Sequence, residues 1–261
     1  FRSRIHPSRR SGDAVTVPTE VRTAVRAQAE QARQACALLK RSSGDQRNAF
    51  LALLATLLRR STEAIIAANA IDLAAGSEAG LNAAMLDRLR LDATRIEGIA
   101  RDVEHVATLP DPIGAHFEAR TLPNGLCVHK RRVPLGVLGV IYESRPNVTI
   151  DVAALAIKTG NAAVLRGGKE AIASNRILLA SARQALVASG LPEGVLQFVD
   201  TVDRDASLVL LQQDDLIDLI IPRGGASLHA FCRRESRIPV ITGGIGICHL
   251  YVDRHADLTR A

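Results

Sequence analysis

The sequence is poor in aromatic residues and long apolar runs. Tryptophan is absent and aromatic side chains make up 3% of the 261 residues. So few rings leave no stacking platform for nucleic-acid bases. No apolar run approaches the roughly 20 residues that a membrane-spanning helix needs. We therefore expect a protein that binds neither nucleic acid nor membrane.

An excess of positive charge is present but is concentrated at one end. The formal net charge is +6, and four arginines without an acid stand within residues 1–12. Without those four charges the remainder is +2, which is close to balanced. We interpret residues 1–20 as a disordered basic tail rather than as a nucleic-acid-binding patch.

Cysteine is scarce and scattered. Cys36, Cys127, Cys232 and Cys248 form no CxxC pair, and the seven histidines show no metal-ligand spacing. This pattern excludes a recognisable zinc motif and favours free thiols in a reducing cytoplasm. Neighbouring residues of a strand point to opposite faces, so Cys248 and His249 cannot form a nucleophile–base pair. The residues alone indicate no convincing nucleophile and no metal site.

Residues 21–115 have the periodicity of helices. Ser43 and Gln46 form a capping box ahead of an apolar stripe, and a further helix is predicted from near Asp92 to before Pro110. Between residues 116 and 134, Asn124-Gly125 lies between two extended runs and predicts a projecting β-hairpin. Its polar second arm either faces water or pairs with another subunit.

After the hairpin, the sequence pattern predicts alternating strands and helices. Strands are predicted at 133–142, 162–166, 195–199 and 216–221, with helices at about 149–159, 171–189 and 203–211. Apolar strands that alternate with helices predict an α/β domain with a doubly wound parallel sheet, here residues 135–248. Its ligand should lie beyond the carboxyl ends of the strands.

Two glycine loops follow predicted strands and open predicted helices. The first contains Arg166, Gly167, Gly168 and Lys169, and the second contains Pro222, Arg223, Gly224 and Gly225. Glycines let backbone N–H groups approach a ligand, and cations at a helix start suit phosphate. Each loop alone is also compatible with an ordinary glycine turn, but two together favour a dinucleotide or a phosphorylated substrate. The usual GxGxxG fingerprint is absent.

Two further segments are candidates. After the first parallel strand, Glu143, Arg145 and Asn147 could converge on a charged substrate, with the Asn147 amide as an oxyanion donor. A turn whose charges pair with each other is the alternative. Thr242, Gly243 and Gly244 lie in a glycine-rich bend that either approaches a nicotinamide or acts as a hinge.

These motifs resemble the γ-glutamyl phosphate reductases, a family of the aldehyde dehydrogenase superfamily. The similar segments are 84–103, 131–175, 219–229 and 238–253, and the resemblance extends from about Val21 to the end. It implies an aldehyde dehydrogenase-like fold with amino-terminal helices, a β-hairpin that joins subunits into a homo-oligomer, a cofactor domain and a catalytic domain that begins at residues 249–261. It also implies NADPH-dependent reduction of L-glutamate 5-phosphate to the semialdehyde, the second step from glutamate to proline, and a possible glutamate 5-kinase partner.

The resemblance also assigns roles to residues. Arg166 matches a strand-end position at the adenosine ribose, and Lys169 replaces a common acid, which favours NADPH over NADH. Pro222 and the loop Arg223 to Gly225 match the pyrophosphate loop, while Glu143 and Arg145 are expected at the substrate. Thr242 stands where hydrolytic relatives carry a water-activating glutamate, which fits a reductase.

The catalytic cysteine of the family is expected downstream of a strand at residues 251–253, beyond Ala261. The sequence as given is therefore expected to bind the cofactor without performing catalysis. Two hypotheses stay open: a truncated reductase with an exposed apolar face, and a stand-alone NADP-binding protein.

Overall fold

The computed structural model describes residues 17–203, 205–243 and 249–259. Residues 1–16 of the expected tail, together with Gly244 and Cys248, lie outside the described residues. The fold itself begins inside the segment assigned to the tail, because Val17 is buried and the first helix starts at Thr19.

Five helices precede the hairpin within the described residues. They are α1 (Thr19–Leu39), α2 (Gly44–Arg60), α3 (Thr62–Glu78), α4 (Ala83–Leu89) and α5 (Ala93–Thr108). The predicted capping box is confirmed. The Ser43 hydroxyl accepts a hydrogen bond from the Gln46 amide, and the Ser43 amide donates to the Gln46 side chain. The helix predicted to begin near Asp92 is α5, and Asp92 caps it by accepting from the amide of Arg95. These local signals set where the helices begin.

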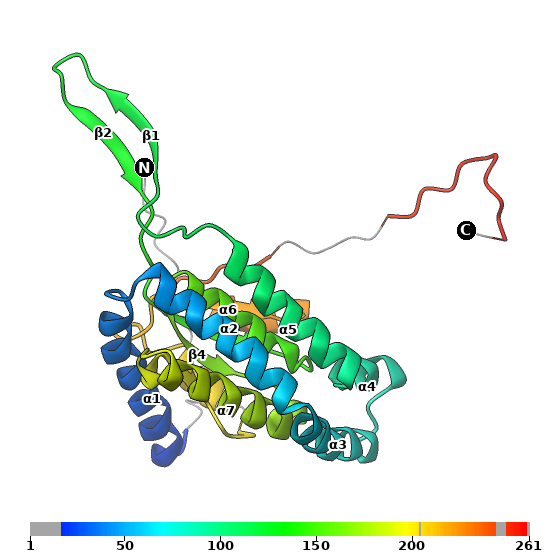
Figure 1. Cartoon of the computed structure of the whole chain (residues 1–261). Coiled ribbons are helices and arrows are strands. Elements are labelled where there is room, and N and C mark those ends of the chain that lie inside the picture. Colours follow the sequence, from blue (N-terminus) through cyan, green and yellow to red (C-terminus); the bar gives the residue numbers. More distant parts are fainter. Residues whose placement is uncertain (1–16, 204, 244–248, 260–261) are drawn as a thin grey trace.

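The hairpin is a separate projection from the globular body (Figure 1). Strands β1 (His116–Thr121) and β2 (Cys127–Arg131) pair antiparallel, and every residue of both is exposed. Gly125 adopts φ 84° in the turn, which only glycine and a few polar residues tolerate readily. The rings of His116 and His129 stack at 4.2 Å, and Phe117 lies below Arg132.

In the described part of the α/β region, four strands form a parallel sheet in the order β5-β4-β3-β6. Its strands are β3 (Val137–Tyr142), β4 (Ala162–Arg166), β5 (Leu196–Phe198) and β6 (Leu219–Arg223). Its helices are α6 (Asn147–Lys158), α7 (Ile172–Ala188), α8 (Asp205–Leu210) and α9 (Ala226–Glu235), with short 3₁₀ turns at Lys169–Ala171 and Glu193–Val195. The predicted doubly wound architecture is confirmed.

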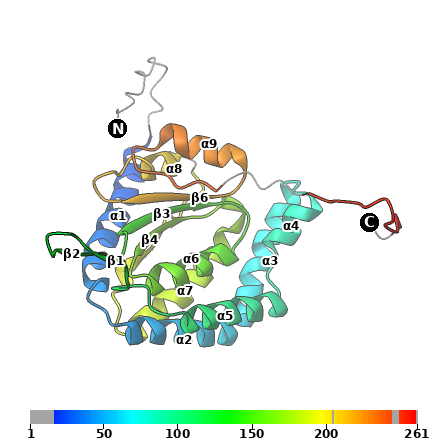
Figure 2. The same ribbon diagram turned by 90° about the horizontal axis from the view of Figure 1, so that it is seen from above.

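The layers explain the apolar pattern. Helices α6 and α7 cover one face of the sheet, α2 and α5 pack outside them, and α1, α8 and α9 lie on the other face (Figure 2). All residues of β3, β4 and β5 are therefore buried, as expected for a sheet covered on both sides.

Three predicted strands differ from the structure. The one predicted at 216–221 forms later, because Leu216 and Ile217 belong to a turn whose amides both donate to Gln213 O. The strand predicted from residue 133 begins at Val137, after Gly136 with φ 133°. Residues 251–253 form no strand and are exposed, since no described strand lies beside them to pair with. In the first two cases, apolar residues directly before the strand do not pair with a neighbouring strand. Among the described helices, none is long and apolar enough to cross a membrane.

Candidate functional site

Three loops meet at the carboxyl edge of the sheet. Tyr142 at the end of β3 pairs with Arg223 at the end of β6, and Ile141 pairs with Arg166 at the end of β4. The chain runs from β3 to β4 and β5 on one side and returns to β6 on the other. The strand order thus reverses between β3 and β6, which is where open α/β sheets bind ligands.

Glu143 joins the two strands at this reversal. Its backbone amide donates to Arg223 O at 3.2 Å, and its carboxylate Oε2 accepts from the amide of Gly225 at 2.9 Å. Gly225 is the N-cap of α9, where backbone N–H groups and the helix dipole favour an anion. A Cβ on Gly224 would overlap the same carboxylate oxygen. The glycine pair therefore allows an acidic group to lie directly on the start of the helix.

A second carboxylate joins the β4 loop to the β3 loop. Glu170 Oε1 accepts from both the amide and the hydroxyl of Ser144, each at 2.7 Å. Ser144 has φ 38°, a conformation that non-glycine residues adopt only when neighbours hold it. Sequence reasoning gave Glu170 no role. The signal that could have found it is its position in the short turn directly after a glycine pair that follows a strand.

Buried polar groups lie beneath the first glycine loop. The Tyr142 hydroxyl is 2.7 Å from Thr149 Oγ1, which in turn donates to Asn175 Oδ1 at 2.8 Å. Burial raises the pKa of Tyr142, so the phenol stays protonated. A Cβ on Gly167 would overlap the Asn175 amide. Close packing against this network therefore requires glycine at position 167.

The two cations of the first loop differ in their surroundings. Arg166 is buried and donates to the carbonyls of Gly167 and Asp203, so it holds the loop together in the structure. Lys169 is exposed beside the amino end of α7. Of these two, Lys169 is the cation that faces solvent.

The β3 loop leads into α6. Asn147, the first residue of that helix, donates from Nδ2 to Asp151 Oδ2 at 3.0 Å. Burial raises the pKa of Asp151, and nearby Asp102 raises it further. Arg145 is exposed. The structure thus brings Glu143, Arg145 and Asn147 to one edge, with Glu143 turned toward α9.

The segment that contains Thr242 reaches the same edge. Val240 forms a parallel bridge with Ile220, and Ile241 N donates to Ile220 O at 3.0 Å. Because the two segments run in parallel, Thr242 and Gly243 follow beside the end of β6. Thr242 is half-buried and Gly243 is exposed.

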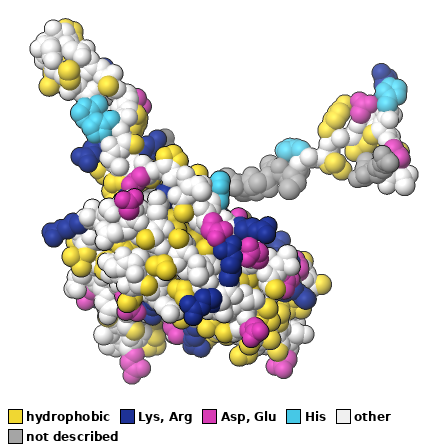
Figure 3. Space-filling model, in the orientation of Figure 1, with side chains coloured by type: hydrophobic (Ala, Val, Ile, Leu, Met, Phe, Trp, Pro, Cys, Tyr) yellow, Lys and Arg dark blue, Asp and Glu magenta, His cyan; other side chains and the backbone are white. Residues whose placement is uncertain are grey.

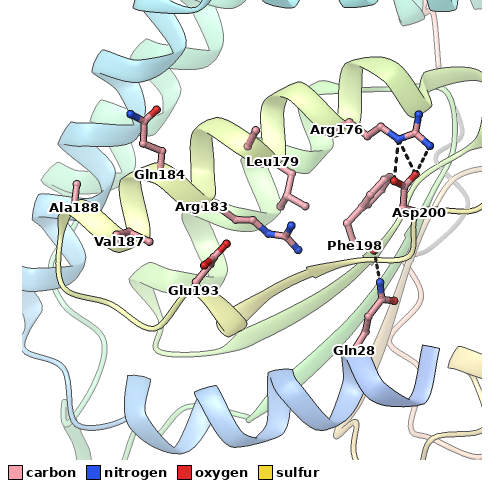
Figure 4. Close-up of a pocket in the computed structure, with 11 residues that line it drawn as sticks. Gln28, Arg176, Leu179, Arg183, Gln184, Val187, Ala188, Glu193, Phe198 and Asp200 are labelled. Carbon is pink, nitrogen blue, oxygen red and sulfur yellow. Dashed lines mark hydrogen bonds and ion pairs between the residues drawn. The ribbon is translucent and has the colours of Figure 1, made fainter. Parts of the chain in front are cut away.

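A further pocket lies away from these loops. A groove of about 800 Å³ runs along the free edge of β5 between α1 and α7 (Figure 4). Gln28 donates to Phe198 O at 2.7 Å, and Arg183 donates to Leu196 O at 3.5 Å. These contacts occupy outward carbonyls of the edge strand, which limits pairing with a foreign strand.

The described residues supply neither a metal cluster nor an activated thiol. No group of three His, Cys, Asp or Glu residues among them could hold a metal ion. Cys232 on α9 is buried, and burial together with the Glu143 charge raises the pKa of its thiol to about 11. Such a thiol is protonated at neutral pH and is a poor nucleophile. Cationic and anionic side chains are interspersed on the face seen in Figure 3.

Comparison with known proteins places this geometry in a family. The family model described as "Aldehyde dehydrogenase family" matches residues 3–229. A γ-glutamyl phosphate reductase of Roseiflexus castenholzii is 56% identical over 216 residues, which cover 82% of this chain and 51% of that protein. One from Vibrio cholerae is 52% identical over 223 residues, covering 85% of this chain and 54% of its own length.

Solved structures agree with these sequence matches. The γ-glutamyl phosphate reductase of Thermotoga maritima superposes with a TM-score of 0.83 at 35% identity, over 90% of this chain and 57% of that one. The Saccharomyces cerevisiae enzyme gives a TM-score of 0.77 at 36% identity, over 91% and 60%. The chain spans about half the length of the curated relatives that it matches.

Proposed function

The chain belongs to the aldehyde dehydrogenase family, and from this we propose that the complete protein is a γ-glutamyl phosphate reductase. The proposed reaction reduces L-glutamate 5-phosphate to L-glutamate 5-semialdehyde with NADPH and releases phosphate, as the second step from glutamate to proline. Support comes from relatives that carry this name and from the cofactor-domain geometry of the chain. The described residues would supply the cofactor site.

One observation carries the cofactor assignment. At the strand-order reversal, the amide of Gly225 at the start of α9 already binds a carboxylate, that of Glu143. Backbone N–H groups that bind one anion at a helix start can bind the pyrophosphate of a dinucleotide in the same way. Gly224 leaves no side chain that would block such an approach.

The exposed cation of the first loop supports NADPH. Lys169 is exposed to solvent at the start of the turn before α7, beyond the carboxyl end of β4. A cation there would pair with a 2′-phosphate, which NADH lacks. Arg166 would act by shaping the loop beside the ribose, since it donates to backbone carbonyls.

The other edge residues would serve the acyl phosphate. The bound cofactor supplies the hydride, and the role of this chain is to hold and orient the reacting groups. The Asn147 amide would donate to the developing oxyanion while Asp151 holds its orientation, and Arg145 would bind a carboxylate or phosphate of the substrate. Thr242, which cannot act as a water-activating carboxylate, would favour reduction over hydrolysis.

A binding titration tests the cofactor assignment. The full chain is titrated with NADPH and with NADH, and nicotinamide fluorescence and thermal stability are followed together. We expect saturable NADPH binding, weaker NADH binding, and at least fivefold weaker NADPH binding for Arg223→Ala. Arg237→Ala, in the turn after α9, is the control. Equal affinities of Arg223→Ala and the wild type would contradict the loop assignment.

A turnover assay tests whether this chain by itself holds a catalytic nucleophile. The raised pKa of the Cys232 thiol argues against this cysteine as the nucleophile. We therefore expect the chain alone to bind NADPH but not to reduce NADP when L-glutamate 5-semialdehyde and phosphate are supplied. Reduction of NADP by the chain alone would show that it holds a nucleophile.

A further inference from the structure

We propose that the Glu143 carboxylate is a placeholder for the pyrophosphate of the cofactor. This inference rests on the proposed function, since it concerns the same loop. The carboxylate holds the start of α9 until a phosphate oxygen takes its place, and it then turns away. Glu143 would thereby lower the affinity for the cofactor and would not be a substrate ligand.

The contact geometry puts the carboxylate where a phosphate would bind. Oε2 lies 2.9 Å from the amide nitrogen of Gly225 and close over Gly224. A phosphate oxygen needs the same N–H group and the same open space above the glycine pair. The two anions cannot share one donor, and their charges repel each other at that separation. Binding of one must therefore release the other.

The exchange needs only a side-chain rotation. The backbone of Glu143 is fixed by its bond to Arg223 O, and the next residue is fixed by the two bonds from Ser144 to Glu170. The side chain of Glu143 itself is exposed, so solvent can receive the displaced carboxylate. Exposed side chains change rotamer within nanoseconds. The carboxylate can therefore leave Gly225 without any movement of the loop backbone.

The placeholder also has a structural purpose. The first amides of α9 have no side-chain cap of their own, because the N-cap is Gly225. A carboxylate at this point satisfies one of these donors and keeps the glycine loop in the shape that an anion requires. The cost is competition with any phosphate that arrives.

Glu143→Gln is the sharpest test. Glutamine keeps an oxygen that can accept from Gly225 but removes the negative charge. The Gly225 amide therefore keeps an acceptor, but the side chain at position 143 competes less strongly with a phosphate. Glu193→Gln is the matched control, since it makes the same charge change on an exposed residue at the amino end of β5. Glu143→Ala is the second variant and should act in the same direction.

The binding of NADPH and of inorganic pyrophosphate to the full chain is measured by isothermal titration calorimetry. We expect Glu143→Gln to bind both probes about threefold to tenfold more tightly than the wild type, and Glu193→Gln to match the wild type. Thermal unfolding verifies that each variant is folded. Unchanged or weaker binding by both Glu143 variants would overturn the placeholder and would favour a ligand-binding role for Glu143.

The two probes separate this inference from the proposed function. Wild-type NADPH binding without any gain in the Glu143 variants rejects the placeholder and leaves the cofactor assignment standing. A gain for pyrophosphate without NADPH binding supports the placeholder at an anion site and rejects the cofactor assignment. Absence of binding for both probes in every variant rejects both proposals.

Discussion

Arg33 of α1 and Asp218 form a paired ion bridge, in which the two guanidinium nitrogens donate to the two carboxylate oxygens at 2.9 and 3.0 Å. Asp218 Oδ2 also accepts from the amide of Val137 at 2.8 Å. One carboxylate thus connects the first helix, the start of β3 and the approach to β6. Gly136 packs so closely against it that a Cβ would overlap the carboxylate.

Replacement of Asp218 should therefore destabilise the fold. Asp218→Ala leaves the Val137 amide and the Arg33 guanidinium without their acceptor, and we expect a loss of about 2 kcal/mol in the free energy of unfolding. Asp215→Ala is the control, because its ion pair with Arg26 is about half exposed and should contribute about 0–1 kcal/mol. Urea denaturation measures both. Equal losses would show that the Asp218 contacts are no stronger than a surface pair.

Asp72 of α3 caps a different helix. Its carboxylate accepts from the amides of Ala173 and Ser174 at 3.1 and 2.8 Å, and α7 has no side-chain cap of its own. Asp72→Ala should lower the free energy of unfolding by about 2 kcal/mol, since buried donors lose their partner. The exposed Glu78 at the end of the same helix provides the control, Glu78→Ala. A loss under about 0.5 kcal/mol in a urea titration would argue against the capping role.

The ion pair between Arg59 and Glu97 predicts that the stability of the fold depends on pH. Hydrogen bonds from Arg59, and then from Arg101, lower the pKa of Glu97 from 4.5 to about 2. Because the folded pKa is the lower one, the stabilisation is present above pH 4.5 and is lost as the pH falls toward 2. Arg59→Met should therefore lower the melting temperature at pH 7 but have little effect near pH 2.

Arg60→Met is the matched control for this comparison, because Arg60 is the exposed neighbour of Arg59. Its melting temperature should follow the wild type at every pH. Thermal unfolding by circular dichroism from pH 7 to pH 2 measures all three proteins. An Arg59→Met deficit that stays constant down to pH 2 would refute the electrostatic origin.

Lys169 should decide between the two nicotinamide cofactors. If it binds the 2′-phosphate, Lys169→Ala should weaken NADPH binding about tenfold or more and leave NADH binding unchanged, since a charge-assisted hydrogen bond contributes about 1.5–3 kcal/mol. Lys40→Ala, an exposed lysine after α1, is the control. Fluorescence titration gives both dissociation constants. An equal loss for NADPH and NADH would remove the 2′-phosphate assignment.

The hairpin should mediate assembly. Its exposed apolar residues include Leu126 at 56% and Val128 at 37%, and no described segment of the chain covers them. Leu126→Ser combined with Val128→Ser should shift an oligomer toward monomer without lowering the melting temperature, because these side chains contribute nothing to the core. Leu38→Ser on α1, also 56% exposed, is the control. Light scattering of the three proteins decides whether the hairpin joins subunits.

Local chemistry in the sequence predicted much of this architecture. The capping box at Ser43, the helix start near Asp92 and the Asn124-Gly125 turn each depend on a few neighbouring residues, and each is confirmed. The continuous apolar runs of β3 and β4 indicated a sheet buried on both faces, and it is. Strand limits were predicted less well where apolar residues such as Ile217 are buried in a turn.

The sequence by itself determined the elements, the parallel sheet and the three loops that follow its strands, because periodicity, caps and turns are local properties of the chain. Only the tertiary structure decided which contacts those loops make with one another. The bond from Glu143 to Gly225 joins residues 82 positions apart, and Asp72 caps a helix more than 100 positions away. Such contacts depend on which strands become neighbours, and no local pattern specifies that.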